Sequence, residues 1–295
     1  MGLDRDGRDF LANCGIRTVG VLDETSGELA ARSLAELAPT LPAEPDLLIL
    51  VAARAPDLLL SSEATRAQAA AGLAGTAAFT LDGLGCTGSS GAWGLAADLL
   101  RADPRRTSVG IVHASRPTGV GRVRSPVSIN GDGAFAMTVQ RGGSPVLRAH
   151  RLQTDGAFHD LFHVDYKQGP WYEWQEECAS PDRYRFELAL HSRERLGSLV
   201  RDVLDDIDRK PSDVAAVVMQ NVTAGAYDFY EALLGMPIHP ACRDNLVRYG
   251  HLGAMDVVLN LRDVLDSGDV DPGGLILVLN NSPVAAWAAT LWEVR

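Results

Sequence analysis

The chain has 295 residues, 46% of them hydrophobic and 22% charged, which supplies enough apolar material for one large domain or two fused halves. Its net charge of −11 argues against general nucleic-acid binding, no apolar run is long enough to cross a membrane, and the start MGLDRDGRDF lacks a secretory signal, so we expect a cytoplasmic protein. The four cysteines lie far apart without a CxxC pair, which indicates neither a zinc site nor a disulfide framework.

In the first half of the chain, apolar runs of strand length alternate with segments of helical spacing. Short continuous apolar runs such as Asp46–Ala52 are typical of strands buried in a sheet that is covered on both faces. We predict helices over 3–13, 26–37, 63–73 and 91–101, and strands over 18–22, 46–52, 77–81, 108–113, 146–154 and, after a Gly-Asp-Gly turn, within 128–139.

The segment 155–182 differs from the rest because it is rich in aromatic residues. We predict an insertion over a pocket, in which Trp171, Phe162 and His163 bind substrate; the alternative is a loop whose aromatic rings pack on the body of the protein. Further helices are predicted over 184–208, 226–234 and 254–267, and further strands over 214–220, 275–279 and 288–294. This alternation favours an α/β layered architecture, and its recurrence suggests duplicated halves at 1–154 and 183–295.

The stretch from Leu81 to Leu100 reads LDGLGCTGSSGAWGLAADLL and places Cys86 where a strand passes into a helix. The partial positive charge at a helix N-terminus favours the thiolate, which is the nucleophilic form of cysteine. The flanking glycines let backbone and substrate approach closely. A free cysteine is also common as an inert core residue, so this stretch alone leaves both roles open.

Four motifs occur in a fixed order: Cys86 within GLGC, NGDGA at 130–134, RYGHLGA at 248–254, and VDPGGLIL at 270–277 followed by Trp287. Together they resemble ketosynthase III (3-oxoacyl-acyl-carrier-protein synthase III) of the thiolase superfamily over nearly the whole chain. The resemblance implies a five-layered αβαβα sandwich of two duplicated halves, a homodimer, and Cys86 as the acylated residue. It also implies an acyl-phosphopantetheine or acyl-CoA donor, with no separate cofactor and no metal.

The chain departs from that family at the two residues that stabilise the enolate intermediate of the condensation reaction. Gln220 stands at the position of the family's catalytic histidine, and His251 stands at the position of its asparagine. The glycine-rich strand near the C-terminus reads Asn280-Asn281-Ser282-Pro283. The family's first strand and its Trp and Arg for the CoA nucleotide have no counterpart here. We therefore keep two alternatives for the acyl donor, a carrier protein and CoA.

A decarboxylative condensing enzyme needs two neutral donors at the enolate oxygen, whereas a thiol, an imidazole and an amide suit acyl transfer. In this hypothesis Cys86 takes the acyl group as a thioester, and His251 removes a proton from an alcohol or amine. Asp256 either orients His251 as the third member of a triad or only caps its own helix. The remaining candidates are Gln220 as a catalytic residue and Asn221 and Asn281 as substrate-binding residues.

The Gly-His…Asp loop and the segment Asn221-Val222-Thr223 resemble ketosynthase III-like acyltransferases of antibiotic pathways, which act on carrier-protein thioesters. We therefore predict an acyltransferase of secondary metabolism that moves an acyl group from an acyl carrier protein or CoA to a small-molecule alcohol or amine. The alternatives are a decarboxylative C–C condensing enzyme and a non-catalytic ketosynthase-like partner subunit. Five arginines between 105 and 124 form either a docking patch for an acidic carrier protein or a solvated loop.

Overall fold

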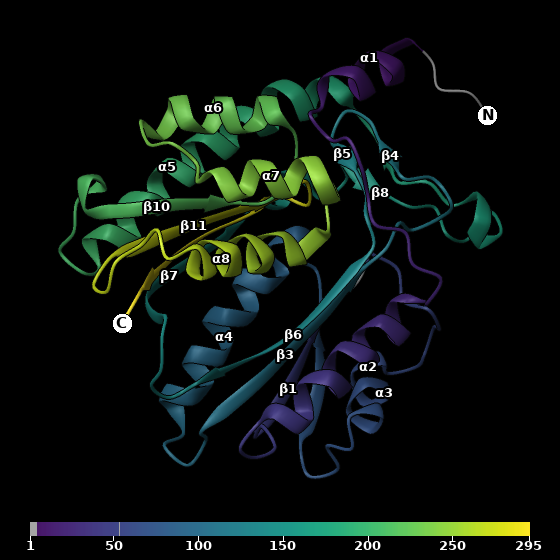
Figure 1. The fold of residues 1–295 in the computed structure, drawn as a ribbon. Helices are drawn as coiled ribbons and strands as arrows, with labels where there is room; N and C mark the ends of the chain where they lie inside the picture. Colours follow the sequence, from purple (N-terminus) through teal and green to yellow (C-terminus); the bar gives the residue numbers. More distant parts are fainter. Residues whose placement is uncertain (1–4, 53) are drawn as a thin grey trace.

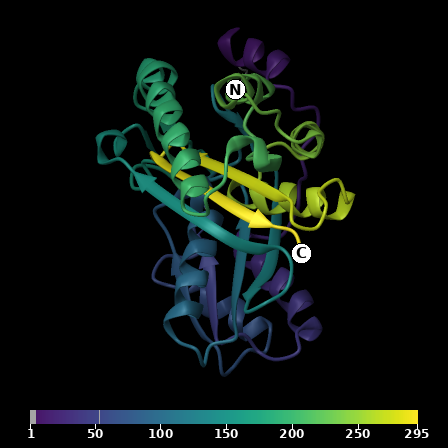
Figure 2. The same cartoon turned by 90° about the vertical axis from the view of Figure 1, so that its left-hand side faces the viewer.

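The computed structural model describes residues 5–52 and 54–295, and these form two four-stranded sheets with helices between and outside them. Figure 1 and Figure 2 show the five layers, with the first sheet in the lower part of the molecule and the second in the upper part. The predicted mixed α/β fold, a five-layered sandwich, is confirmed. Its helices are α1 Arg5–Asn13, α2 Ser26–Leu37, α3 Glu63–Ala70, α4 Gly88–Ala102, α5 Ala189–Asp205, α6 Ala224–Leu234, α7 Pro240–Tyr249 and α8 Asp256–Ser267.

The first sheet has the strand order β2-β1-β3-β6. Strand β1 lies parallel to both β2 and β3, and β6 runs antiparallel to β3. The inner strands are almost fully buried, as expected for apolar runs in a covered sheet. Their bounds are β1 Leu47–Val51, β2 Ala77–Leu81, β3 Ser108–Ser115 and β6 Gly133–Gln140.

The second sheet also has four strands, in the order β10-β11-β12-β7, but its strand directions differ from those of the first. Strand β10 is parallel to β11, and β12 is antiparallel to both β11 and β7. The strands are β7 Val146–Thr154, β10 Val214–Met219, β11 Leu275–Ser282 and β12 Ala286–Glu293. Strand β7, which the sequence analysis places in the first half, therefore belongs to the second sheet, because its backbone pairs with β12 and not with β6.

Helices α4 and α8 lie between the two sheets, whereas α2 and α3 cover the outer face of the first sheet and α5 that of the second. Trp93 of α4 is fully buried, and its ring meets Trp292 of β12 edge-on at 5.3 Å between centroids. Gly94 packs directly against the ring of His150, so a side chain there would collide with β7. Small residues in α4 thus let one helix contact both sheets.

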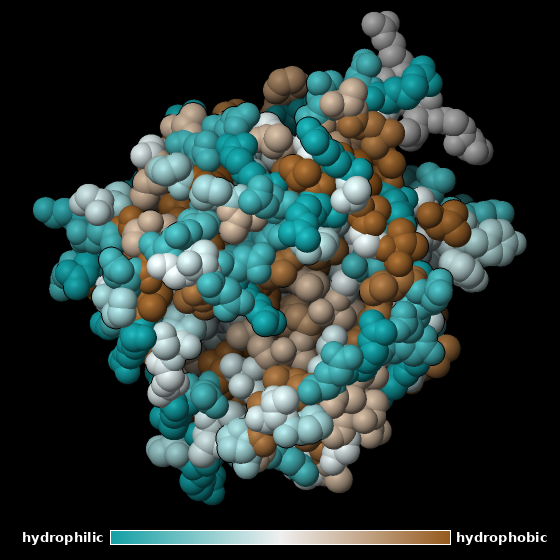
Figure 3. Space-filling view, in the orientation of Figure 1, coloured by the Kyte–Doolittle hydropathy of each residue, from teal (hydrophilic) through white to brown (hydrophobic). Residues whose placement is uncertain are grey.

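The two sheets differ at one edge. Strand β12 has β7 as its outer neighbour, whereas β6 pairs only with β3 among the strands that the structure describes. A groove of 1490 Å³ follows this open edge, with Met137 on one side and Val258 and Leu261 of α8 on the other. Figure 3 shows the apolar surface in this hollow at the centre of the molecule. The strand predicted over 18–22 does not form, so it does not cover the edge.

The predicted insertion 155–182 holds two short antiparallel strands, β8 Phe162–His163 and β9 Glu177–Cys178. A second small pair, β4 Val123–Arg124 and β5 Ser128–Ile129, lies in the connection before β6. The long helix predicted over 184–208 forms, but its first part, Arg183–Leu188, is wound as a π-helix before α5 begins. No helix in residues 5–52 and 54–295 is both long and apolar enough to span a bilayer.

Candidate active site

Cys86 lies in a single 3-10 turn, Gly85–Thr87, that leads from β2 into α4. Its backbone N–H donates to Ser282 Oγ at 3.3 Å, and its carbonyl oxygen accepts from Asn280 Nδ2 at 2.9 Å. Gly85 has a φ of +51°, and a Cβ at this position would collide with the Ser282 hydroxyl. The second sheet therefore fixes the turn that carries the thiol.

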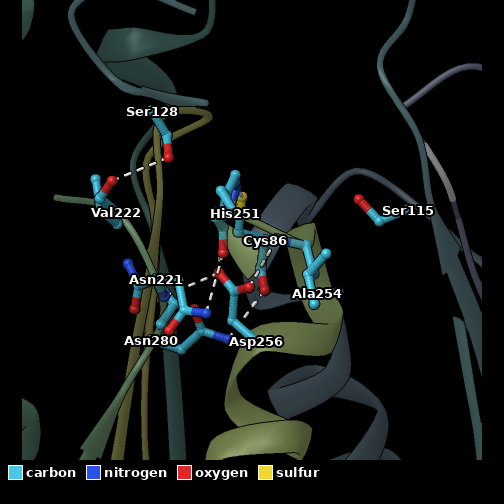
Figure 4. A network of polar contacts seen from close by, with 12 residues as sticks. Cys86, Ser115, Ser128, Asn221, Val222, His251, Ala254, Asp256 and Asn280 are labelled. Carbon is cyan, nitrogen blue, oxygen red and sulfur yellow. Dashed lines mark hydrogen bonds and ion pairs between the residues drawn. The ribbon is translucent and has the colours of Figure 1, made fainter. Parts of the chain in front are cut away.

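The Cys86 thiol contacts an imidazole from the other half of the chain. Cys86 Sγ lies 3.1 Å from His251 Nε2, and His251 Nδ1 lies 2.6 Å from Asp256 Oδ2. All three residues are buried; Asp256 has no exposed surface. Figure 4 shows the three side chains in succession, with Asp256 behind the imidazole at the start of α8. A nucleophile, a base and an orienting carboxylate thus form one connected set.

The loop before His251 is held by the Gly-Asp-Gly turn of the first half. His251 N donates to Ile129 O at 2.9 Å, and its carbonyl oxygen accepts from Gly131 N at 3.0 Å. Gly250 has a φ of +65°, and a Cβ there would lie 2.7 Å from Ile129 O, so only glycine fits. Asp132 completes the turn by accepting from both Nη atoms of Arg122. This turn positions the imidazole and takes no direct part at the thiol.

Asp256 makes three contacts with its carboxylate, and none of them caps α8. Besides His251, it accepts from the backbone N–H of Leu252 at 2.7 Å and of Asn221 at 2.9 Å. The Asn221 side chain donates to Gly250 O and accepts from Asn260 and from the Tyr227 hydroxyl. The carboxylate is therefore fixed by donors on all sides, as an orienting group requires.

Burial and charge act in opposite directions on the thiol. Burial alone opposes the thiolate, but the imidazolium of His251, its hydrogen bond, and the guanidiniums of Arg54 and Arg124 together lower the pKa of Cys86 to about 7. Burial likewise opposes the charged imidazole, but Cys86 and Asp256 raise the pKa of His251 to about 9. Near pH 8 the pair therefore favours thiolate and imidazolium.

Comparisons with known proteins show what the chain is similar to. Residues 204–294 match the family model described as 3-Oxoacyl-[acyl-carrier-protein (ACP)] synthase III C terminal. A beta-ketoacyl-[acyl-carrier-protein] synthase III from Erythrobacter litoralis is 29% identical and covers 93% of this chain and 86% of its own. The synthase III structure from Pseudomonas aeruginosa has a TM-score of 0.78 at 21% identity, covering 98% of this chain and 89% of its own. The chain is ketosynthase III-like over nearly its whole length.

Two further solved structures come from proteins with different activities. ChlB3, described as an acyltransferase, has a TM-score of 0.81 at 23% identity and covers 93% of this chain and 86% of its own. AbyA1, described as a tetronic acid condensing enzyme, has a TM-score of 0.75 at 18% identity, with 99% and 92% covered. At these identities both show that the ketosynthase III-like fold is shared. The expected acyl thioester donor and the expectation of no separate cofactor accord with this family.

Gln220, which we expected at the position of the family's histidine, bonds to Asn281 and not to Cys86. Its amide nitrogen donates to the backbone and side-chain oxygens of Asn281, and its amide oxygen accepts from Asn281 N at 3.2 Å. Asn281 in turn donates to the Tyr230 hydroxyl at 2.8 Å. Gln220 and Asn281 thus brace each other along one wall of a cavity that also contains Cys86 and His251.

Two cavities meet at Cys86 in this ketosynthase III-like fold. One, of 320 Å³, is lined by Tyr184, Phe229 and Tyr230 together with Gln220 and Asn281. The other, of 240 Å³, lies on the side of Arg54, His113 and the β8 strand. In Figure 4, Ser128 of the first cavity and Ser115 of the second stand on opposite sides of Cys86. The thiol is therefore open to two separate spaces.

Three of the predicted substrate-binding residues meet the cavities and two do not. Phe162 and His163 line the smaller cavity, and Asn281 lines the larger one. Trp171 is 61% exposed and lines neither cavity, so its predicted place in the pocket is wrong. Asn221 is fully buried behind Asp256 and also lines neither, because its polar atoms are all engaged with protein groups.

Of the two alternatives for the arginines between residues 105 and 124, the structure favours a loop with balanced charges over a docking patch. Arg116 and Arg122 form ion pairs with the buried carboxylate of Asp132, and Arg124 forms an ion pair with Glu176. Only Arg105, bound to Asp103, is well exposed among the side chains in ion pairs there. The charge of this segment is engaged in internal contacts, so it leaves no continuous docking surface.

Sequence reasoning missed Arg54, Ser282 and Asn260. Arg54 follows β1 and lines the smaller cavity, Ser282 bonds the Cys86 N–H, and Asn260 supports Asn221. A charged residue after a buried strand was the available signal for Arg54, because the carboxyl ends of parallel strands gather at one edge of a sheet. No group of His, Cys, Asp and Glu side chains in the described residues has the arrangement of a metal site.

Proposed function

We propose that this ketosynthase III-like protein is an acyltransferase of secondary metabolism that works through a Cys86 thioester. The observation that carries the proposal is the unbroken chain of contacts from Cys86 Sγ to His251 to Asp256. A thiol with a pKa of about 7 supplies thiolate near neutral pH, and an oriented imidazole can move protons. These are the two requirements of acyl transfer through a covalent intermediate.

In the first step, the Cys86 thiolate attacks the carbonyl carbon of an acyl thioester. A new C–S bond forms to Cys86, the bond to the donor sulfur breaks, and the leaving thiolate takes the proton held at His251 Nε2. The backbone N–H of Cys86, which now donates to Ser282, lies next to the carbon that becomes tetrahedral. This N–H is the backbone donor that we assign to the oxyanion.

In the second step, an alcohol or amine attacks the thioester on Cys86. Acylation removes the negative charge of the thiolate, which is one of the groups that raise the pKa of His251. The imidazole is then neutral and accepts the proton of the attacking group, while Asp256 stabilises the imidazolium that forms. The acyl group leaves as an ester or amide, and Cys86 is restored.

A C–C condensing activity is the second candidate, because AbyA1 is described as a condensing enzyme and the curated relatives are named synthases. It would require Gln220 and His251 to hold an enolate. Two observations argue against it. The Gln220 amide is already bonded to Asn281, and His251 is bonded to the carboxylate of Asp256, an arrangement that suits a base that transfers protons. A non-catalytic partner subunit accounts poorly for a thiol and imidazole in contact.

The proposed donor is an acyl carrier protein or acyl-CoA, and the proposed acceptor is a small-molecule alcohol or amine, in the cytoplasm. We further propose a homodimer. The outer edge of β2 is exposed, and Phe79 on that strand is 39% exposed, which offers a surface for a second copy. Sedimentation of the purified chain tests the dimer independently of the chemistry.

The test of the activity is intact-protein mass after incubation with acyl-carrier-protein and acyl-CoA thioesters. We expect a mass gain in the wild type and none in Cys86→Ala. The acyl-enzyme is then isolated and mixed with alcohols and amines, or with malonyl-carrier protein. Loss of the acyl group to an alcohol or amine supports transfer, whereas CO2 release with a β-ketoacyl product supports condensation. Absence of any mass gain would favour the partner-subunit role.

A further inference from the structure

The smaller cavity at Cys86 contains a guanidinium that no carboxylate neutralises. Arg54 follows β1, and its Nη1 donates to Ser115 Oγ at 3.2 Å and to Arg116 O at 3.4 Å. Its Nη2 is buried and has no hydrogen-bond partner. In the part of the chain that the structure describes, no Asp or Glu forms an ion pair with Arg54. A buried donor of this kind is costly unless a ligand completes it.

The neighbouring Arg124 differs from Arg54 because a carboxylate in the same cavity pairs with it, although its Nε also lacks a hydrogen-bond partner. Arg124 forms an ion pair with Glu176, and its guanidinium also stacks over the Phe162 ring at 4.9 Å. Arg124 and Glu176 both line the cavity, so their charges cancel there. His113 also lines this cavity and is held neutral because burial lowers its pKa to about 4. His163, a further basic side chain of the cavity, lies 3.8 Å from the carboxylate of Glu177. Arg54 therefore leaves one uncompensated positive charge.

We infer that the smaller cavity binds the far end of an acyl group that carries a carboxylate, and that Arg54 pairs with this carboxylate. The inference rests on the proposed acylation of Cys86 and names the class of acyl group. Cys86 and Arg54 line the same 240 Å³ cavity, so a thioester on the sulfur points its chain towards the guanidinium. Guanidinium and carboxylate have matching planar geometry, and such charge-assisted pairs are strong when desolvated.

The other charged groups near the cavity do not compete for this role. Glu176 is held by Arg124, and Asp256 lies behind His251 with its oxygens taken by three donors. Asp82 also lines the cavity, but it is exposed and its carboxylate accepts from the N–H of Gly83. The Cys86 thiolate is the buried anion that remains, and it disappears when the thioester forms. At that moment the Arg54 charge has lost its nearest counter-charge, and a carboxylate on the acyl chain replaces it. The chemistry of the acylation step itself is unchanged.

The experiment compares pairs of pantetheine thioesters that differ only at the far end. Malonyl is paired with acetoacetyl and succinyl with levulinoyl, so that a methyl ketone replaces each carboxylate. The rate of Cys86 acylation is followed by intact-protein mass for the wild type, Arg54→Met, Arg54→Lys and the control Arg262→Met. Arg262 is exposed on α8 and pairs with Asp266, away from both cavities. Thermal unfolding confirms that each variant is folded.

In at least one of the two pairs, we expect the carboxylated donor to acylate the wild type and Arg262→Met faster than its neutral partner does, by roughly 10- to 100-fold. Arg54→Met should react more slowly with the carboxylated donor only, so the preference is lost. Arg54→Lys should keep part of the preference. Wild-type preference for the neutral donors would overturn the inference and leave the acyltransferase proposal standing. Absence of acylation with every donor would overturn both.

A different role for Arg54 would give a different pattern. If the guanidinium serves only to stabilise the thiolate, Arg54→Met slows all donors equally and slows alkylation of Cys86 by iodoacetamide to the same extent. That result would contradict recognition of the acyl group. If the carboxylated donor alone is affected and alkylation stays within about threefold of wild type, Arg54 recognises the acyl carboxylate.

Discussion

His251 Nδ1 donates to Asp256 Oδ2 at 2.6 Å, although the carboxylate belongs to the first residue of α8 and the imidazole to the loop before it. The contact fixes the tautomer in which Nε2 faces Cys86. It also leaves the carboxylate unavailable for capping α8 in the usual way, and among the described residues no side chain caps the start of this helix. Asp256 thus orients the imidazole of His251, and a variant that lacks the carboxylate tests this role.

We expect Asp256→Asn to slow transfer from the preformed acyl-enzyme by roughly 100- to 10,000-fold. The asparagine has one acceptor oxygen for the three donors that now meet the carboxylate, so one buried N–H is left unsatisfied. The free energy of unfolding should therefore fall by about 1–3 kcal/mol. Single-turnover transfer and thermal unfolding measure the two effects. An unchanged transfer rate in a folded variant would show that Asp256 is structural only.

The pH dependence of Cys86 reactivity tests the thiolate–imidazolium pair. In the wild type we expect iodoacetamide alkylation to rise with pH with a midpoint at about 7, because deprotonation forms the thiolate. In His251→Ala the midpoint should move towards the ordinary value of 9.0, which lowers the rate at pH 7 by about 50-fold. The exposed His159, outside both cavities, provides the control His159→Ala. Equal midpoints in all three proteins would contradict the pairing.

Gly85 is predicted to be irreplaceable for the geometry of the thiol. Gly85→Ala must adopt a left-handed backbone at a cost of about 1–2 kcal/mol, and its Cβ meets the Ser282 hydroxyl. We expect lower stability and slower acylation of Cys86. Gly225→Ala is the matched control, because Gly225 lies near the start of α6 with open space where the alanine Cβ would lie. It should be neutral or stabilise the protein. Similar unfolding temperatures for the two variants would refute the argument.

Two aromatic residues of the same segment should behave differently. Phe162 lines the smaller cavity and packs against Tyr184 at 5.3 Å between ring centroids, so Phe162→Ala should weaken donor binding and raise the KM for acylation. Trp171 is exposed and lines neither cavity, so Trp171→Ala should leave KM and kcat within about twofold. Steady-state kinetics with one donor decide the matter. A larger effect of the tryptophan change would mean that it touches the substrate.

The layered fold and the central motifs were predictable from the sequence because buried strands and their helices leave strong periodic signals. The Asp46–Ala52 run became β1, and the segment around Cys86 became the turn before α4. Strand β7 was assigned to the wrong half, since a strand's own residues do not show which sheet edge it joins. The strand predicted over 18–22 does not form although β6 has an open edge among the described strands, because an apolar pattern does not show whether a segment pairs with a neighbouring strand.

Contacts within the site were predictable only between residues that lie close together in the sequence. His251 and Asp256 are five positions apart in the chain, so the sequence suggested the contact between them. The approach of Cys86 to His251 joins residues 165 positions apart and depends on how the two halves pack. The unpaired charge of Arg54 and the exposure of Trp171 are likewise properties of packing, which no local pattern reports.

The thiol and its imidazole come from different halves of the chain, which has a consequence during biosynthesis. Before the halves dock, Cys86 has no imidazolium beside it, and its pKa stays near the ordinary 9.0, so few molecules carry a thiolate at neutral pH. A nascent chain is thus protected from stray electrophiles and oxidants until folding is complete. Fast labelling by a mild alkylating agent therefore counts only molecules in which both halves have assembled.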